Sequence, residues 1–198
     1  MKTSKILTVA LLGLVTMAFT ACNSDNDVRT LTKQEIAQCF NTVRGSYNGE
    51  LIYKSENKNN PRDVTDTVAI KWTIGTDSTL VIEQFPSKVL ALNVTNTELK
   101  QSLEAAPNQD VKCRIGFIET SPIGFLINPS APSFDLNYGG KVHKVQVAFM
   151  GNNYSSFGQY TTSKKTLVMQ IIEGAIFVDN NRTEFLKQPI GFVLQAKK

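Results

Sequence analysis

The sequence contains a single histidine, His143, and this scarcity excludes most of the common catalytic sites. A Ser–His–Asp triad, a histidine acid–base pair and a histidine-based zinc site would all depend on that one residue. His143 lies on an apolar strand face close to a turn, where a histidine with a structural hydrogen bond is the usual finding. The sequence also has no CxxC motif, no HExxH motif and no glycine-rich phosphate loop. We therefore predict a protein without catalytic residues, metal ligands or a cofactor.

A concentrated basic stretch is missing as well. The chain has 21 Lys and Arg against 17 Asp and Glu, and no stripe of one sign stands out. Proteins that bind nucleic acid carry a basic stripe or patch. We therefore expect no nucleic-acid partner.

Carboxylates that would suit a glycosidase-type pair do occur, but nothing in the sequence fixes the separation that this mechanism needs. They lie on the solvent side of a predicted strand or in the loop of about 55–64, and they are Glu50, Glu56, Asp63 and Asp66. A solvated surface is the simpler interpretation of all four. The oxygen-rich stretch 179–184 lacks the spacing of a calcium loop, and a β-turn explains it better.

No hydrophobic run is long enough to span a bilayer as a helix. Residues 6–19 form an uncharged run of 14 residues, preceded by Lys2 and Lys5. This is the length of a secretory leader and is shorter than the ~18 residues that a transmembrane helix needs. We predict a signal peptide over residues 1–21, with cleavage after Ala18 as the alternative. The 177 residues that remain are about the size of one domain, and their formal charge is +2 instead of +4.

The stretch Phe19–Cys22 resembles the lipobox of bacterial lipoproteins, with Phe at the position where Leu is usual. The resemblance implies that the leader is cut before Cys22 and that the cysteine is acylated, which anchors the protein in the outer membrane. Asp25 and Asp27 resemble the surface-export signal of Bacteroidetes lipoproteins, and a solvated spacer is the alternative reading. We therefore expect a lipidated tether over residues 22–31. The domain beyond it either faces the periplasm or is displayed on the cell surface.

Residues 32–198 are predicted to form a single β-rich domain. Apolar and polar residues alternate in 43–53, 66–75, 111–117 and 143–149, as in half-buried antiparallel strands. Thr32 with Glu35 has the form of a capping box and predicts a helix over about 33–41, and Thr95 precedes a second helix over about 96–106. We predict an α+β fold that is mainly antiparallel β, a barrel or sandwich of about eight to ten strands with two short accessory helices.

Several segments resemble a known kind of lipoprotein. "VAIKWTI" at 68–74, "DSTLVIEQFPSKVLAL" at 77–92 and "TELKQSL" at 97–103, together with the leader, are similar to a family of Bacteroides lipoproteins of roughly 200 residues and unknown function. "RGSYNGEL" at 44–51 resembles the first strand of calycin-like β-barrel lipoproteins. The resemblance implies the lipoprotein anchor and the single domain, and it brings no known activity or catalytic residue.

The sequence "PIGFLIN" at 122–128 is echoed by "PIGFVLQ" at 189–195. The similarity reflects either an old duplication or the same structural requirement at the start of two strands. The second interpretation predicts two strands that each begin after a proline and carry a glycine with an aromatic neighbour across the backbone.

Two cysteines and two hydroxyl residues are candidates for covalent modification. Cys39 and Cys113 fall on apolar faces, so they are either two buried thiols or a disulfide, which an oxidising envelope permits. Thr67 and Ser78 lie in three-residue segments that resemble the O-glycosylation pattern of Bacteroidetes envelope proteins. Both are expected to be reachable from solvent.

The stretch "GNNYSSFGQY" at 151–160 has the composition of a recognition loop. Its aromatic rings offer contact surface and its amides offer hydrogen bonds. The predicted ligand-binding residues are Asn152, Asn153, Tyr154, Phe157 and Tyr160. The alternative is a hairpin loop whose aromatic side chains fold back onto the core.

These observations rank three classes of function. The first is a non-catalytic binding module for a small ligand or glycan, and the second is a component of protein–protein interaction or assembly at the outer membrane. A hydrolase comes last because no catalytic constellation is visible. The expected partners are the membrane, through Cys22, and a glycan, lipid or protein.

Overall fold

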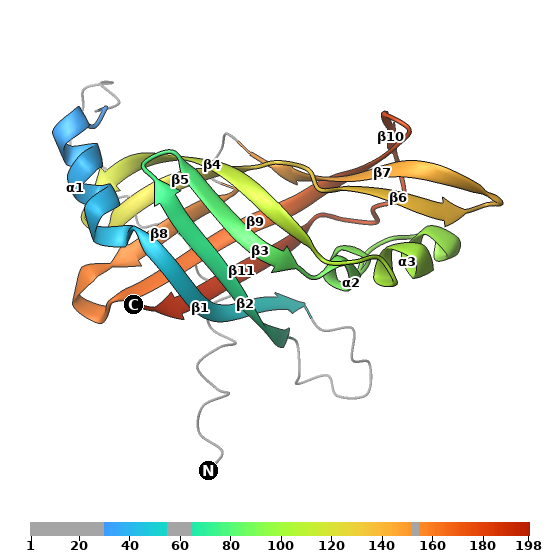
Figure 1. Ribbon diagram of the computed structural model, residues 1–198, viewed down its shortest axis with the longest axis horizontal. Coiled ribbons are helices and arrows are strands. Elements are labelled where there is room, and N and C mark those ends of the chain that lie inside the picture. Colours follow the sequence, from blue (N-terminus) through green and yellow to red (C-terminus); the bar gives the residue numbers. More distant parts are fainter. Residues whose placement is uncertain (1–29, 55–64, 152–154) are drawn as a thin grey trace, which may run out of the picture.

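The computed structural model describes residues 30–54, 65–151 and 155–198. Their strands form one 11-stranded antiparallel sheet, most of which curls into a closed barrel (Figure 1). The predicted class, mainly antiparallel β with short helices, is confirmed, and of the two architectures expected the barrel is the one observed.

Eight strands close the barrel. Neighbours pair in the order β1, β2, β3, β4, β5, β8, β9 and β11, and β11 then pairs with β1. Their bounds are β1 (Gly45–Lys54), β2 (Thr65–Thr76), β3 (Thr79–Phe85), β4 (Gln109–Thr120), β5 (Ile123–Pro129), β8 (Phe157–Thr161), β9 (Thr166–Val178) and β11 (Ile190–Lys197). A short 3₁₀ turn, η1 (Thr162–Lys164), connects β8 to β9.

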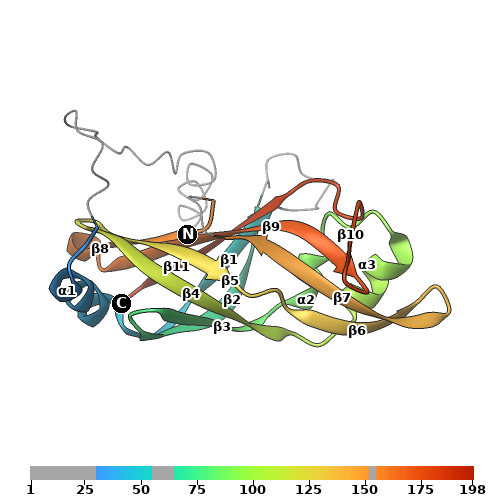
Figure 2. The ribbon, with the colours of Figure 1, turned by 90° about the horizontal axis from the view of Figure 1, so that it is seen from above.

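Strand β9 belongs to two parts of the molecule. Its first residues pair with β8 and β11 inside the barrel, whereas residues 172–178 pair with β7 and residues 176–178 with β10. The strands of this extension are β6 (Ser133–Tyr138), β7 (Lys141–Met150) and β10 (Asn181–Thr183). Figures 1 and 2 show the β6–β7 hairpin reaching beyond the barrel at the end opposite to helix α1.

Three short helices cover the two ends of the molecule. Helix α1 (Lys33–Val43) begins at the predicted capping box, in which the Thr32 hydroxyl accepts from the Glu35 amide and the Glu35 carboxylate accepts from the Thr32 amide. It packs against β4. Helices α2 (Ser87–Leu90) and α3 (Thr97–Glu104) pack on one another, and α3 lies against β6 (Figure 1).

The turns follow from residues that the sequence makes visible. Gly139 and Gly140 have φ of +59° and +81°, the left-handed values that a two-residue hairpin between β6 and β7 requires. Asp179 and Asn180, with φ of +50° and +65°, make the predicted turn between β9 and β10.

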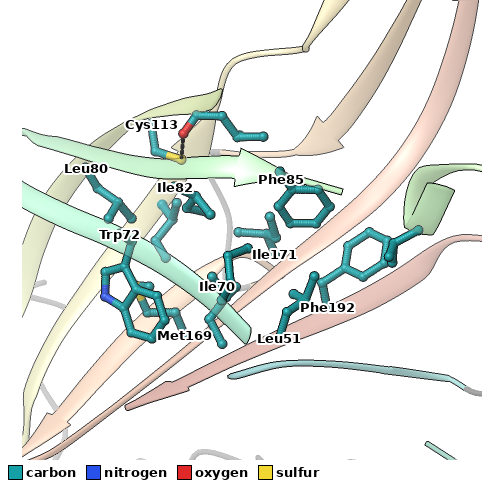
Figure 3. Close-up of a cluster of buried hydrophobic side chains, with 14 of the residues drawn as sticks. Leu51, Ile70, Trp72, Leu80, Ile82, Phe85, Cys113, Met169, Ile171 and Phe192 are labelled. Carbon is teal, nitrogen blue, oxygen red and sulfur yellow. Dashed lines mark hydrogen bonds between the residues drawn. The ribbon is translucent and has the colours of Figure 1, made fainter. Parts of the chain in front are cut away.

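The barrel interior is occupied by large apolar side chains. Trp72, Phe85, Phe125 and Phe192 are fully buried, and Figure 3 shows three of them packed with aliphatic neighbours such as Ile171. An eight-stranded barrel is just wide enough for side chains to fill it. The two grooves described below lie on the outer face and along an edge of the sheet.

Candidate functional site

The predicted recognition loop is shorter than its sequence suggests. Asn152, Asn153 and Tyr154 lie outside the described residues. Phe157 and Tyr160 belong to β8, and both side chains are buried, each with 4% exposed. Of the two interpretations of this stretch, burial of both rings agrees with the one in which the aromatic side chains fold back onto the protein, and regular strand pairing begins at Phe157.

The two rings point to opposite sides of the barrel wall. Tyr160 is a register partner of Ile123 and Leu167 and belongs to the hydrophobic core. Phe157 pairs with Leu126 and Gln170 and is not part of that core cluster. Neither ring therefore forms part of an exposed aromatic surface.

Hydrogen bonds of Ser156 hold the chain in place directly before β8. Its hydroxyl donates to the carbonyl of Met150 and accepts from the amide of Ile172 at 3.3 Å. Its own carbonyl accepts from the amide of Ile127 at 2.9 Å. The serine that looked like an adaptable recognition residue thus joins β5, β7 and β9.

Both cysteines within the described residues are free, buried thiols. The Cys39 thiol donates weakly to the carbonyl of Glu119 at 3.8 Å, and the Cys113 thiol to the carbonyl of Val111 at 3.6 Å. Of the two alternatives, the disulfide is wrong and the pair of buried thiols is confirmed. Burial raises the pKa of the Cys113 thiol to about 12.

The remaining candidates lie apart from one another. Thr67 and Ser78 are both exposed, as glycosylation would require. Glu50 and Asp66 are exposed on neighbouring strands, but Glu50 faces Ala69 in the register, so the two carboxylates are not cross-strand partners. Cys22, Glu56 and Asp63 lie outside the described residues.

His143 has a structural role. Its Nδ1 lies 2.8 Å from Oδ2 of Asp179, and its ring stacks on Tyr138 with centroids 4.4 Å apart. The other Asp179 oxygen accepts from the amide of Lys144 at 3.0 Å. Hydrogen bonds from His143 and then from the Lys144 amide hold the pKa of the Asp179 carboxyl below its ordinary value. The group joins the β6–β7 hairpin to the β9–β10 turn, and no cluster of metal ligands is found among the described residues.

A buried carboxylate is a feature that sequence reasoning missed. Glu173 is 0% exposed, and neither carboxylate oxygen has a hydrogen-bond partner in the described structure. Its register partners are Phe149 on β7 and Ile190 on β11. Burial in these apolar surroundings raises the pKa of the Glu173 carboxyl well above its ordinary value, which favours the neutral form. The signal was available, because Glu173 continues the inward series of Leu167, Met169 and Ile171.

The outer face of β4 and β5 carries a groove of about 510 Å³, which we call the β4–β5 groove. It lies outside the barrel because Arg114, Gly116 and Ile118 alternate with Ile115 and Phe117, which belong to the core. The groove is hollow at Gly116, which faces Leu126 in the register. A Cβ added at Gly116 would meet no atom within 4 Å.

The side chains around Gly116 combine charge with apolar surface. Arg114 is exposed, pairs with Asn128 in the register, and has no ion pair with any described residue. Ile118 and Leu126 provide an aliphatic wall. A groove with one cation, one amide and aliphatic walls suits a small ligand that has an anionic and an apolar part.

The predicted recognition stretch begins at the rim of this groove. The atoms nearest to a Cβ built at Gly151 belong to Asn128, so the start of the 151–160 stretch lies against a groove residue. Two residues of the alternating strand 109–120 could have indicated the groove from the sequence. They are Gly116 and Ile118, which occupy solvent-facing positions. Both break the apolar-in, polar-out pattern of the barrel wall.

The fold and the groove define a β-barrel domain with a concave site on its outer wall. The chain belongs to the family described as Domain of unknown function (DUF4840), whose model matches residues 42–178, more than two thirds of the chain. No curated protein and no solved structure matches it. None of the described helices is long and apolar enough to cross a membrane.

Proposed function

We propose that this protein is an outer-membrane lipoprotein, anchored through acylated Cys22, whose barrel domain binds a small ligand without catalysis. The β4–β5 groove is the observation that carries the proposal. It combines an empty side-chain position at Gly116 with a guanidinium, that of Arg114, which has no ion-pair partner among the described residues. A ligand there gains both apolar contact and a charge-assisted hydrogen bond.

The chemistry of the groove narrows the class of ligand. A carboxylate, sulfate or phosphate matches Arg114, and the Asn128 amide can donate to or accept from a neighbouring oxygen. Ile118 and Leu126 match an aliphatic ring or chain. Anionic amphiphiles and acidic glycans combine these features.

The membrane anchor is supported by the leader and by Cys22 at its end. Each buried CH₂ of an acyl chain contributes about 0.8 kcal/mol, so two or more chains hold a protein on a bilayer without a transmembrane helix. Seven residues lie between Cys22 and Thr30, where the described structure begins. The groove would then work close to the membrane surface.

Ligand binding is tested by a thermal-shift screen of the purified protein against fatty acids, bile acids and uronic-acid oligosaccharides. A ligand at a hundred times its Kd stabilises the folded state by about 2.7 kcal/mol, which is readily measured. Gly116→Val should abolish the shift by filling the groove, and Arg114→Gln should weaken binding of an anion about tenfold or more. Gly191→Val is the matched control, because Gly191 also has no atom within 4 Å of an added Cβ but lies on β11. Equal ligand shifts in the two glycine variants would refute the groove as the site.

Anchoring is tested separately by labelling cells with a palmitate analogue. The label should be lost, and the protein released from membranes, in Cys22→Ala. A variant that stays labelled and membrane-bound would contradict the anchor and leave the groove experiment unaffected.

A further inference from the structure

Strand β6 is the last strand of the sheet, because the strand order ends at β6 beyond its partner β7, and side chains of α3 and β4 already bond part of its outer edge. An edge strand presents backbone N–H and C=O groups to which a further strand can pair. Which residues present them follows from the hydrogen bonds of the neighbouring chain.

The odd-numbered residues of β6 direct their backbone groups away from β7. The carbonyl of Pro132 accepts from the amide of Val147 on β7, so even positions face β7. The carbonyls of Ser133 and Asn137 are bound on the other side, by the Gln109 side-chain amide at 2.8 Å and by the Ser102 hydroxyl at 2.9 Å. Asp135 lies between them in the same orientation, and no described residue hydrogen-bonds to its outward N–H or C=O.

A second groove, of about 470 Å³, runs along this edge, and we call it the α3–β6 groove. One wall consists of five consecutive residues, Ser133–Asn137, which span about 16 Å of extended chain. The opposite wall, beyond the C-terminal end of α3, has the small side chains of Ala105, Ala106 and Pro107. The unpaired backbone groups of Asp135 beside this groove suit a short extended chain better than a compact ligand.

The side chains of Gln109 and Ser102 already occupy the positions that a neighbouring strand would take at either end of the groove. They leave one residue, Asp135, with both backbone groups available. Among the described residues, Asp135 is also the only charged one that lines the groove, and no described cation forms an ion pair with it. Its charge favours a Lys or Arg directly opposite, as in an ordinary cross-strand pair.

We propose that β6 binds an extended peptide segment of a partner protein, which pairs with the strand at Asp135 in the α3–β6 groove. One residue of the peptide exchanges both backbone hydrogen bonds with Asp135, and a basic side chain on that residue pairs with the Asp135 carboxylate. This peptide site is separate from the β4–β5 groove, so its test does not depend on the ligand proposed there.

The probe is a capped pentapeptide, TVKVT, titrated into the purified protein labelled with ¹⁵N. Binding should shift the Asp135 amide signal, and methylation of the backbone nitrogen of the central Lys should weaken binding about tenfold or more. Ala105→Phe should abolish binding by filling the groove. Ala37→Phe, at an exposed alanine of α1, is the matched control and should bind as the wild type does.

Charge specificity provides a second measurement that does not rely on loss of binding. Asp135→Lys should prefer TVEVT to TVKVT, reversing the preference of the wild type. The proposal is overturned if the wild type binds neither peptide, if Ala105→Phe and Ala37→Phe bind equally, or if the N-methylated peptide binds as tightly as its parent.

Discussion

The ring of Phe125 on β5 lies directly against Gly158, its register partner on β8. A Cβ placed on Gly158 would overlap three carbon atoms of that ring. Phe125 is fully buried, so the ring has little room to move away. The close approach of β5 and β8 therefore requires glycine at this position.

Gly158→Ala should lower the free energy of unfolding by about 1–3 kcal/mol, the usual cost of overpacking a core. Gly116→Ala, on the outer face with no atom within 4 Å, is the matched control and should be close to neutral. Urea unfolding followed by Trp72 fluorescence measures both. A Gly158→Ala protein as stable as the wild type would show that the ring can shift at little cost.

The sequence predicted contacts between a glycine and an aromatic ring, but it placed them at the wrong glycines. The repeated "PIGF" segments suggested aromatic neighbours at Gly124 and Gly191, but the nearest atoms at Gly124 belong to Glu119 and Ile118, and Gly191 has none within 4 Å. Rings do cover Gly158 and also Gly49, where the neighbour is Trp72. Strand register decides which ring meets which glycine, and a single sequence does not contain the register. The prolines were predicted correctly, since β5 and β11 each begin directly after one.

Glu173 makes the stability of the fold depend on pH. The carboxyl is neutral in the folded state, whereas in the unfolded chain it ionises near pH ~4.3. The contribution of this carboxyl to the free energy of unfolding is fully present below that pH. It falls as the pH rises toward the raised folded-state pKa, by at most about 1.4 kcal/mol per pH unit.

Glu173→Gln should remove that part of the pH dependence, because glutamine has a similar shape and does not titrate. The gain in stability over the wild type should therefore grow as the pH rises above about 5, as measured by urea unfolding. Parallel pH profiles for the two proteins would show that Glu173 titrates normally.

His143 should control the acidity of Asp179 at the far end of the molecule. His143→Ala removes the strongest hydrogen bond to the Asp179 carboxylate, so the pKa of that carboxyl should rise toward its ordinary value. Because a carboxyl with a lowered pKa stabilises the fold above its unfolded-state pKa, the wild type loses this contribution as pH falls below about 4. Carboxyl-carbon NMR of Asp179 checks the shift, and an unchanged titration in the variant would contradict the pairing.

The two core thiols should be unreactive in the folded protein. In a Cys22→Ala background, neither Cys39 nor Cys113 should react with a thiol reagent until the protein is unfolded, because both are buried and burial raises both pKa values. Reductant should leave the melting temperature unchanged. A melting temperature that falls on reduction would indicate a disulfide after all.

Local patterns predicted the elements of this fold better than its site. Alternation located β1, β2, β4 and β7, and the capping box located α1, since these signals depend only on neighbours along the chain. The β4–β5 groove depends on Gly116 facing Leu126, a pairing across two strands. The recognition stretch failed for a local reason, because glycine and serine around Phe157 suggested a loop where β8 begins. Ser156 has its bonding partners on other strands, which no local pattern reveals.

Closure of the barrel joins segments that are far apart in the chain, such as Glu50 on β1 and Gln195 on β11. Contacts between such distant segments slow folding to the range of milliseconds to seconds. Until β11 has been synthesised, β1 and β9 each keep an open edge, and open edges promote aggregation. The chain therefore cannot complete its barrel until its C-terminal strand has been made.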